Sequence, residues 1–189
     1  YKLNLINCGL VWQIVEKLMP EFKEIKGDRH YSMIAKLLHW GFAILFLYGI
    51  IKQVDNINQL EDISVLKLEI LFATIFVLLL AIRFTYMKKT QKSSLPNETP
   101  KLQKLAAKIV HYGMYISLAA IACSGLLIGF LFWFGVKNGF LLDIVVGIHE
   151  FAVSVIYWLI GAHIIGALYH RLLKDGVWSS MVPFWRETS

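Results

Sequence analysis

Four apolar stretches, each long enough to cross a lipid bilayer, constrain the fold of this chain more than any other feature. They run from about residue 34 to 51, 65 to 86, 105 to 134 and 140 to 173. A helix needs about 20 apolar residues to span about 30 Å of hydrocarbon, so the last two stretches have length to spare for tilting or for emerging from the bilayer. Backbone polar groups find no water in the hydrocarbon, which makes these stretches helical. We therefore expect an all-α, integral membrane four-helix bundle.

Positive charge gathers at alternate ends of these stretches. The positive blocks precede the first stretch, fill the linker from 87 to 104 and follow the last stretch. The linker from 52 to 62 is instead rich in acidic residues. A net charge of +6 would also suit a nucleic-acid-binding protein, but charge placed in blocks beside apolar runs indicates membrane topology. We expect membrane lipid as a partner, no nucleic acid, and both termini on the cytoplasmic (or matrix) side.

The first residues are expected to lie outside the bundle. Residues 1–28 form an amphipathic N-terminal extension that is too short and interrupted to span a membrane. It suits either an interfacial helix or an arm that docks on another subunit. Residues 29–176 make the predicted four-helix membrane domain, and residues 177–189 a C-terminal tail. Because the chain opens on a tyrosine, we expect its natural N-terminus to lie upstream.

Histidines mark the expected functional site. His149, His163 and His170 follow one another at spacings of 14 and 7 residues on the last stretch. At about 100° per residue, both spacings return to nearly the same helix face. His39, on the first stretch, has about the same depth as His163, and two imidazoles on facing helices can hold a haem iron from both sides. We predict a b-type haem there, against the alternative that these histidines are only buried core residues.

Four segments of the chain resemble the bacterial cytochrome b561 family. They are DRHYSMIAKLLHW at 28–40, LLLAIRFTY at 78–86, KLAAKIVHYGMYISL at 104–118, and GIHEFAVSVIYWLIGAHIIGALYHRLLKDG at 147–176. The resemblance covers about residues 28–176. It implies a four-helix, di-haem, quinone-linked cytochrome of the bacterial inner membrane. Some members of the family are superoxide oxidases, which pass electrons from superoxide to ubiquinone.

The resemblance also implies a set of haem ligands, with one departure. The ligands of the inner haem fall on His39 and His163, and one ligand of the outer haem falls on His149. The second outer ligand, a histidine in the family, falls on Glu69. A carboxylate is a poor partner for a low-spin b haem. We therefore expect the outer haem to be lost or weakened, with Glu69 and His149 paired; a five-coordinate haem on His149 and a shifted alignment are the alternatives.

Three further residues are candidates for cofactor binding near the cytoplasmic side. Arg83 suits a haem propionate, because its guanidinium fork fits a carboxylate, and a snorkelling anchor is the other interpretation. His111 and His170 suit a propionate or a quinone carbonyl, as the quinone region of the family implies, and a structural role is the alternative.

Two functional hypotheses follow. The first is a membrane b-type cytochrome that transfers single electrons between a quinone and a partner, either superoxide or a redox protein, and it includes a possible superoxide:quinone oxidoreductase. The second is a membrane-anchor or accessory subunit of a larger respiratory complex, with one haem or none, docked through residues 1–28. The first suits the bacterial inner membrane, and the second suits the mitochondrial inner membrane as well.

Overall fold

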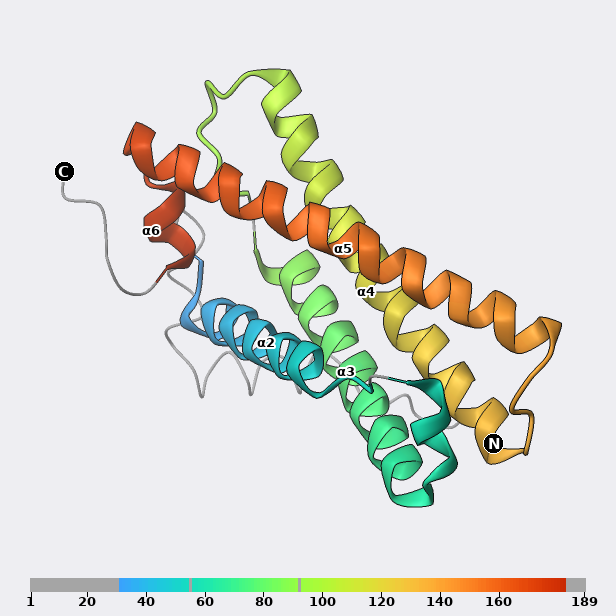
Figure 1. The fold of residues 1–189 in the computed structure, drawn as a ribbon. Coiled ribbons are helices and arrows are strands. Elements are labelled where there is room, and N and C mark those ends of the chain that lie inside the picture. The colour runs from blue at the N-terminus through green and yellow to red at the C-terminus, as the bar shows by residue number, and fades with distance from the viewer. Residues whose placement is uncertain (1–30, 55, 92, 183–189) are drawn as a thin grey trace, which may run out of the picture.

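The fold is a bundle of four long helices with two short helices at its ends (Figure 1). The structure is a computed structural model, and it describes residues 31–182 except 55 and 92. The long helices are α2 (Met33–Lys52), α3 (Ile63–Thr90), α4 (Lys101–Trp133) and α5 (Phe140–Leu173), and the short ones are η2 (Ile57–Glu61) and α6 (Val177–Met181). Each long helix is long and apolar enough to cross a membrane. The predicted all-α four-helix membrane fold is therefore confirmed, and the described residues contain no strand.

Local hydrogen bonds begin two of the long helices. The hydroxyl of Ser32 accepts from the N–H of Ala35 at 3.1 Å at the start of α2. The carboxylate of Asp62 accepts from the N–H of Ser64 at 2.7 Å at the start of α3. Side-chain acceptors at this position satisfy N–H groups that have no partner within the helix. The same backbone hydrogen bond from Ser64 lowers the pKa of the exposed Asp62 carboxyl.

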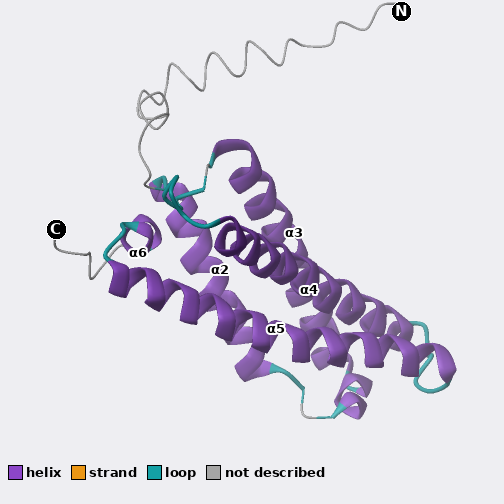
Figure 2. Ribbon diagram, turned by 90° about the horizontal axis from the view of Figure 1, so that it is seen from above, coloured by secondary structure: helices purple, strands orange, loops and turns teal. Residues whose placement is uncertain are grey.

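Helix α4 forms the centre of the bundle. It packs along α5 on one side and α3 on the other, whereas α2 packs mainly on α3 (Figure 2). A buried apolar cluster joins the four long helices, made of Phe42, Phe76, Leu80, Leu118, Ala122 and Ile156. Close approach of α3 and α4 depends on Gly129, because a Cβ atom there would lie 2.6 Å from Cγ1 of Ile70. This glycine therefore serves helix packing.

The exterior of the bundle is apolar. Phe140, Trp158 and Leu172 leave 81%, 83% and 82% of their surfaces exposed. Many other large apolar side chains on the four long helices are also exposed, and apolar surface of this extent marks contact with a partner or a membrane. On four helices of membrane-spanning length, the covering environment is lipid.

The two ends of the bundle differ in charge. At one end α2 and α4 begin and α3 and α5 end (Figure 1). The N–H of Ser32 donates to Oε1 of Gln91 at 3.2 Å between α2 and α3, and Gln103 lies 3.5 Å from His170 between α4 and α5. We call this end the basic end, and its cationic side chains are Lys88, Lys89, Lys101, Lys104, Arg171 and Lys174. At the opposite end, an exposed ion pair of 3.1 Å between Lys137 and Glu61 joins two linkers. The alternation of charge in the sequence thus corresponds to two distinct ends of the folded bundle.

Part of the predicted tail is ordered into helix α6. It lies between the end of α5 and the start of α2 (Figure 1), where Trp40 Nε1 donates to the carbonyl oxygen of Met181 at 3.3 Å. Residues 183–189 and the predicted amphipathic extension, residues 1–28, lie outside the described part of the chain.

Candidate haem site

Three histidines from three helices meet in the half of the bundle nearest the basic end. The ring centres of His39 on α2 and His163 on α5 lie 6.1 Å apart, with their planes at 59°. His111 on α4 lies edge-on to His163, with ring centres 5.0 Å apart. The structure therefore brings together the two histidines predicted to bind haem and adds His111 to them.

The separation of His39 and His163 fits two axial ligands of one iron. With about 2 Å from metal to nitrogen and about 1 Å from nitrogen to ring centre on each side, two axial imidazoles have centres about 6 Å apart. The observed value is 6.1 Å. The distance between the two ring centres thus matches that expected of two axial ligands of one iron.

Space is open beside Gly166, which lies close to His163 on α5. Gly166 follows His163 by about one turn on nearly the same face of α5. No heavy atom outside the local helix lies within 4 Å of the place where a Cβ atom of Gly166 would be. The same is true of Gly41 and Gly161, so these glycines do not serve close helix packing as Gly129 does. Space beside these three glycines is therefore open.

Arg83 on α3 completes the site. Its Nη2 donates to Nδ1 of His39 at 2.8 Å, since a guanidinium has no acceptor. Its guanidinium carbon also lies 5.5 Å from the ring centres of both Phe42 and Tyr115. Among the described residues, the buried Nε atom of Arg83 has no hydrogen-bond partner, an arrangement that is costly unless a ligand supplies an acceptor. A haem propionate has the charge and the oxygen atoms to do so.

The hydrogen bonds define which nitrogen of each histidine carries its proton. His111 Nδ1 donates to the carbonyl oxygen of Ala107 at 2.7 Å, so its neutral ring has an unprotonated Nε2. His39 accepts at Nδ1 from Arg83, so its neutral ring is protonated at Nε2. Binding of a metal through Nε2 of His39 therefore requires Arg83 to release Nδ1.

His149 lies apart from this group, toward the opposite end of α5. Its ring packs over α4, where a Cβ atom at Gly125 would lie 3.5 Å from Cε1. The hydroxyl of the buried Ser124 donates to the carbonyl oxygen of Ala120 at 2.5 Å, so it accepts from Nδ1 of His149 at 2.9 Å. Nε2 of His149 is thereby left unprotonated, as in a metal-binding histidine whose other nitrogen is held by a partner.

Glu69 does not pair with His149, contrary to the favoured expectation. Within the described part of the chain, Glu69 makes no hydrogen bond or ion pair. It is half-buried and lines a small space of about 20 Å³ beside Tyr48, Gly49 and Phe72. The partner of His149 is Ser124 instead of the predicted Glu69, because α4 lies closest to this face of α5.

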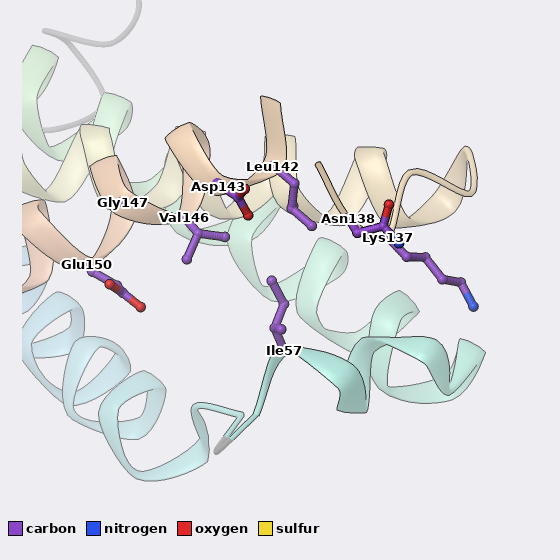
Figure 3. A pocket seen from close by; sticks show the side chains of 8 residues that line it. All are labelled: Ile57, Lys137, Asn138, Leu142, Asp143, Val146, Gly147 and Glu150. Carbon is purple, nitrogen blue, oxygen red and sulfur yellow. The ribbon is translucent and has the colours of Figure 1, made fainter. Parts of the chain in front are cut away.

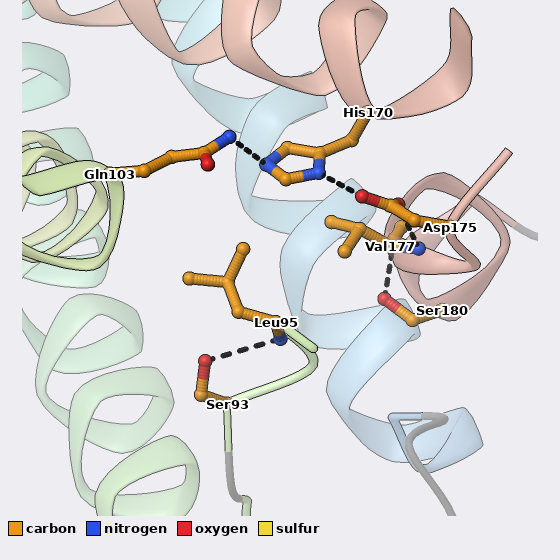
Figure 4. Close-up of polar contacts among 7 residues, drawn as sticks. All are labelled: Ser93, Leu95, Gln103, His170, Asp175, Val177 and Ser180. Atoms are coloured by element: carbon orange, nitrogen blue, oxygen red, sulfur yellow. Dashed lines mark hydrogen bonds and ion pairs between the residues drawn. The ribbon is translucent and has the colours of Figure 1, made fainter. Parts of the chain in front are cut away.

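His170 is buried at the basic end, where Figure 4 shows its contacts. Its Nδ1 lies 2.5 Å from Oδ2 of Asp175, and its Nε2 lies 3.5 Å from the side-chain nitrogen of Gln103 on α4. Within the described part of the chain, no hydrogen bond or ring contact joins it to His39 or His163. Neither Asp175 nor Gln103 was predicted from the sequence, although a carboxylate five residues after a histidine at a helix end was a visible signal.

A cavity of about 320 Å³ lies near the opposite end, between η2 and α5 (Figure 3). Its lining includes the charged side chains of Lys137, Asp143 and Glu150. None of the predicted site residues lines this cavity, although Glu150 is the neighbour of His149 in the sequence. The candidate haem site and this cavity are therefore separate features.

Four membrane-length helices with two facing histidines at iron-binding separation define a class of protein, the membrane-embedded helical-bundle cytochromes. A family model described as prokaryotic cytochrome b561 matches residues 30–184. The chain belongs to this family and is a multi-pass membrane protein of b-type haem electron transfer. No curated protein and no solved structure gives a significant match to it.

Proposed function

We propose that this protein transfers single electrons between a quinone and a second redox partner through one haem held by His39 and His163. The observation that carries the proposal is the 6.1 Å separation of these two rings on facing helices. Haem supplies the one-electron chemistry when bound, and the protein supplies its position, ligands and surrounding charge. Superoxide or a redox protein is the proposed second partner, and superoxide:quinone oxidoreductase activity is the corresponding enzymatic function.

Arg83 is proposed to exchange one partner for another when haem binds. In the described structure it donates to Nδ1 of His39 and keeps Nε without a partner. A propionate would attract the guanidinium, because a carboxylate accepts charge-assisted hydrogen bonds from it. Release of Nδ1 then lets the His39 proton move there and leaves Nε2 free for the iron.

The quinone is proposed to bind at the basic end, near His170. This histidine is buried at the end of α5, and its Nε2 lies 3.5 Å from the side-chain nitrogen of Gln103. A quinone oxygen would make a shorter hydrogen bond with the same nitrogen. By the positive-inside rule, this end is proposed to face the cytoplasm, so that both described termini lie on that side of the bacterial inner membrane.

The outer haem is proposed to be absent or weakly held. His149 has the proton arrangement of a ligand. The resemblance to the family implies that its partner position on α3 is Glu69. A carboxylate does not replace imidazole in a low-spin b haem. Glu69 in place of a histidine also favours the second candidate function, an accessory subunit of a respiratory complex. One haem alone does not give a complete path for electrons across the membrane. Residues 1–28 are the proposed docking segment for that role.

Haem reduction by a quinol tests the proposal. Purified protein with bound haem is mixed with decylubiquinol, and haem absorption is followed by stopped flow. Rapid, saturable reduction supports a quinone-linked cytochrome. Absence of reduction by quinol, with normal reduction by dithionite, would contradict it, and migration with a larger complex on a native gel would then favour the accessory role.

A further inference from the structure

The buried pair of His170 and Asp175 is a group of side chains that the haem site does not use (Figure 4). Their side chains are only 10% and 19% exposed, and the distance from Nδ1 to Oδ2 is 2.5 Å. Short hydrogen bonds of this kind between an imidazole and a carboxylate are stronger than those between neutral groups. The pair lies at the basic end, where α5 turns into α6.

The backbone around Asp175 fixes the position of its carboxylate. Lys174 adopts a left-handed conformation with φ of 53°, and Gly176 follows with φ of 86°. The second carboxylate oxygen, Oδ1, accepts from the N–H of Val177 at 3.2 Å, which begins α6. Ser180 in turn donates to the carbonyl oxygen of Val177 at 2.6 Å. One oxygen of Asp175 is thus used to begin a helix, and the other is directed at His170.

The hydrogen bonds determine the proton arrangement of His170. Its Nδ1–H donates to Asp175, because a carboxylate can only accept. Its Nε2 faces the amide nitrogen of Gln103, which is a donor, so the neutral ring presents a lone pair on that side. A proton arriving at Nε2 would create an imidazolium beside a carboxylate, which stabilises it. The same logic applies to histidine–aspartate pairs that act as general bases.

We propose that Asp175 is a positioning residue, which holds His170 so that its Nε2 exchanges a proton with a quinone oxygen at the basic end. This inference rests on the proposed quinone function. Oxidation of one quinol would take two turns: in each, one O–H bond breaks, its proton passes to Nε2 of His170, and one electron passes to the haem that His39 and His163 would hold. Between the turns, the second redox partner takes the electron from the haem and His170 releases its proton to water. In the reverse direction, His170 returns the proton to the quinone oxygen as the electron leaves the iron. The side-chain nitrogen of Gln103, 3.5 Å from Nε2 of His170, gives way to the quinone oxygen.

Replacing Asp175 with asparagine tests this role. Asparagine keeps the shape and the acceptor for Val177 but cannot stabilise an imidazolium. In the full chain with haem, in nanodiscs, we expect Asp175→Asn to lower the maximal rate of haem reduction by decylubiquinol at least about tenfold, since general base catalysis contributes about 10²- to 10⁴-fold. The half-saturating decylubiquinol concentration should change little, and Asp175→Glu should restore part of the rate. Asp143→Asn, at the other end of α5, is the matched control and should leave the rate unchanged.

Two further readouts separate this role from a structural one. Reduction by dithionite and the haem spectrum should be the same in Asp175→Asn and wild type, and the wild-type rate should show a solvent isotope effect. Nitrogen NMR of labelled wild-type protein should find His170 protonated at Nδ1, and protonation at Nε2 alone would overturn the inference without any variant. If decylubiquinol reduces wild type and Asp175→Asn equally fast, the inference fails while the quinone function stands. If decylubiquinol does not reduce wild type, both fail.

Discussion

Arg83 donates a hydrogen bond of 2.8 Å to Nδ1 of His39, the nitrogen on the far side of the ring from the proposed iron-binding atom. The bond connects α3 to α2, which otherwise make fewer contacts than the other neighbouring long helices. It also holds a positive charge beside the proposed haem. Arg83 therefore influences both the proton arrangement of a ligand and the electrostatic potential at the iron.

Removing this charge should lower the midpoint potential of the haem. A nearby positive charge favours the reduced iron, which carries one charge fewer than the oxidised iron. We expect Arg83→Gln to lower the potential by about 60 mV, equivalent to about tenfold in a one-electron equilibrium, and to weaken haem retention. Redox titration followed by absorption measures the change. Lys101→Gln removes an exposed charge at the basic end and should have a much smaller effect; equal shifts in both variants would contradict the role of Arg83.

The axial ligands can be distinguished by alanine substitution. We expect His39→Ala and His163→Ala each to abolish the low-spin haem signal, because each removes one of two axial nitrogens. His149→Ala should change that signal little, since His149 lies at another depth and is bound to Ser124. Absorption and electron paramagnetic resonance spectra provide the measurement. Loss of the spectrum in His149→Ala alone would show that the wrong pair has been identified.

Restoring a histidine at position 69 should restore the outer haem. His149 already has an unprotonated Nε2, because its Nδ1 donates to Ser124. We expect Glu69→His to raise the haem content from about one to about two per chain, by the preference of low-spin b haem for two imidazoles. Glu69→Gln, which removes the charge but supplies no ligand, should stay at one. A pyridine haemochrome assay, divided by the protein concentration, measures the haem content per chain. An unchanged content in Glu69→His would refute the assignment of position 69 as the missing ligand of the outer haem.

Helix packing at Gly129 should be sensitive to a single methyl group. A Cβ atom there would lie 2.6 Å from Cγ1 of Ile70, which is attached close to the α3 backbone and cannot rotate away freely. We expect Gly129→Ala to destabilise the protein by about 1–3 kcal/mol, as other overpacked cores do. Thermal unfolding in detergent, followed by circular dichroism, measures it.

Two variants control for the effect of alanine itself. No heavy atom outside the local helix lies within 4 Å of a Cβ atom at Gly147, so Gly147→Ala should be neutral or stabilising by up to about 1 kcal/mol. Adding Ile70→Ala to Gly129→Ala should recover part of the lost stability. If the losses of stability from Gly129→Ala and Ile70→Ala simply add in the double variant, the contact between these two positions would be contradicted.

The sequence predicted the long helices closely, because membrane spans are defined by apolar length alone. The fourth stretch, 140–173, coincides with α5, whose caps are Gly139 and Lys174. Helix α3 runs from 63 to 90 rather than 65 to 86, and α4 begins at 101 rather than 105. Lysines extend the end of α3 and the start of α4 beyond the apolar stretches, at depths where their side chains reach the interface.

The sequence predicted only those contacts of the candidate site that depend on the depth of a residue in the membrane. His39 and His163 could be paired because each lies a similar number of residues from the same end of its helix. The partners Ser124 of His149 and Gln103 of His170 could not be predicted, because they depend on the rotation of α4 against α5. Hydrophobic stretches without a clear polar face specify that rotation weakly.

The haem content of the purified protein tests the central claim most directly. A reduced-minus-oxidised spectrum is combined with haem quantification per chain. The account predicts about one low-spin, bis-histidine b haem, held by the pair of rings 6.1 Å apart. Two low-spin haems in the wild-type protein, or none, would contradict it.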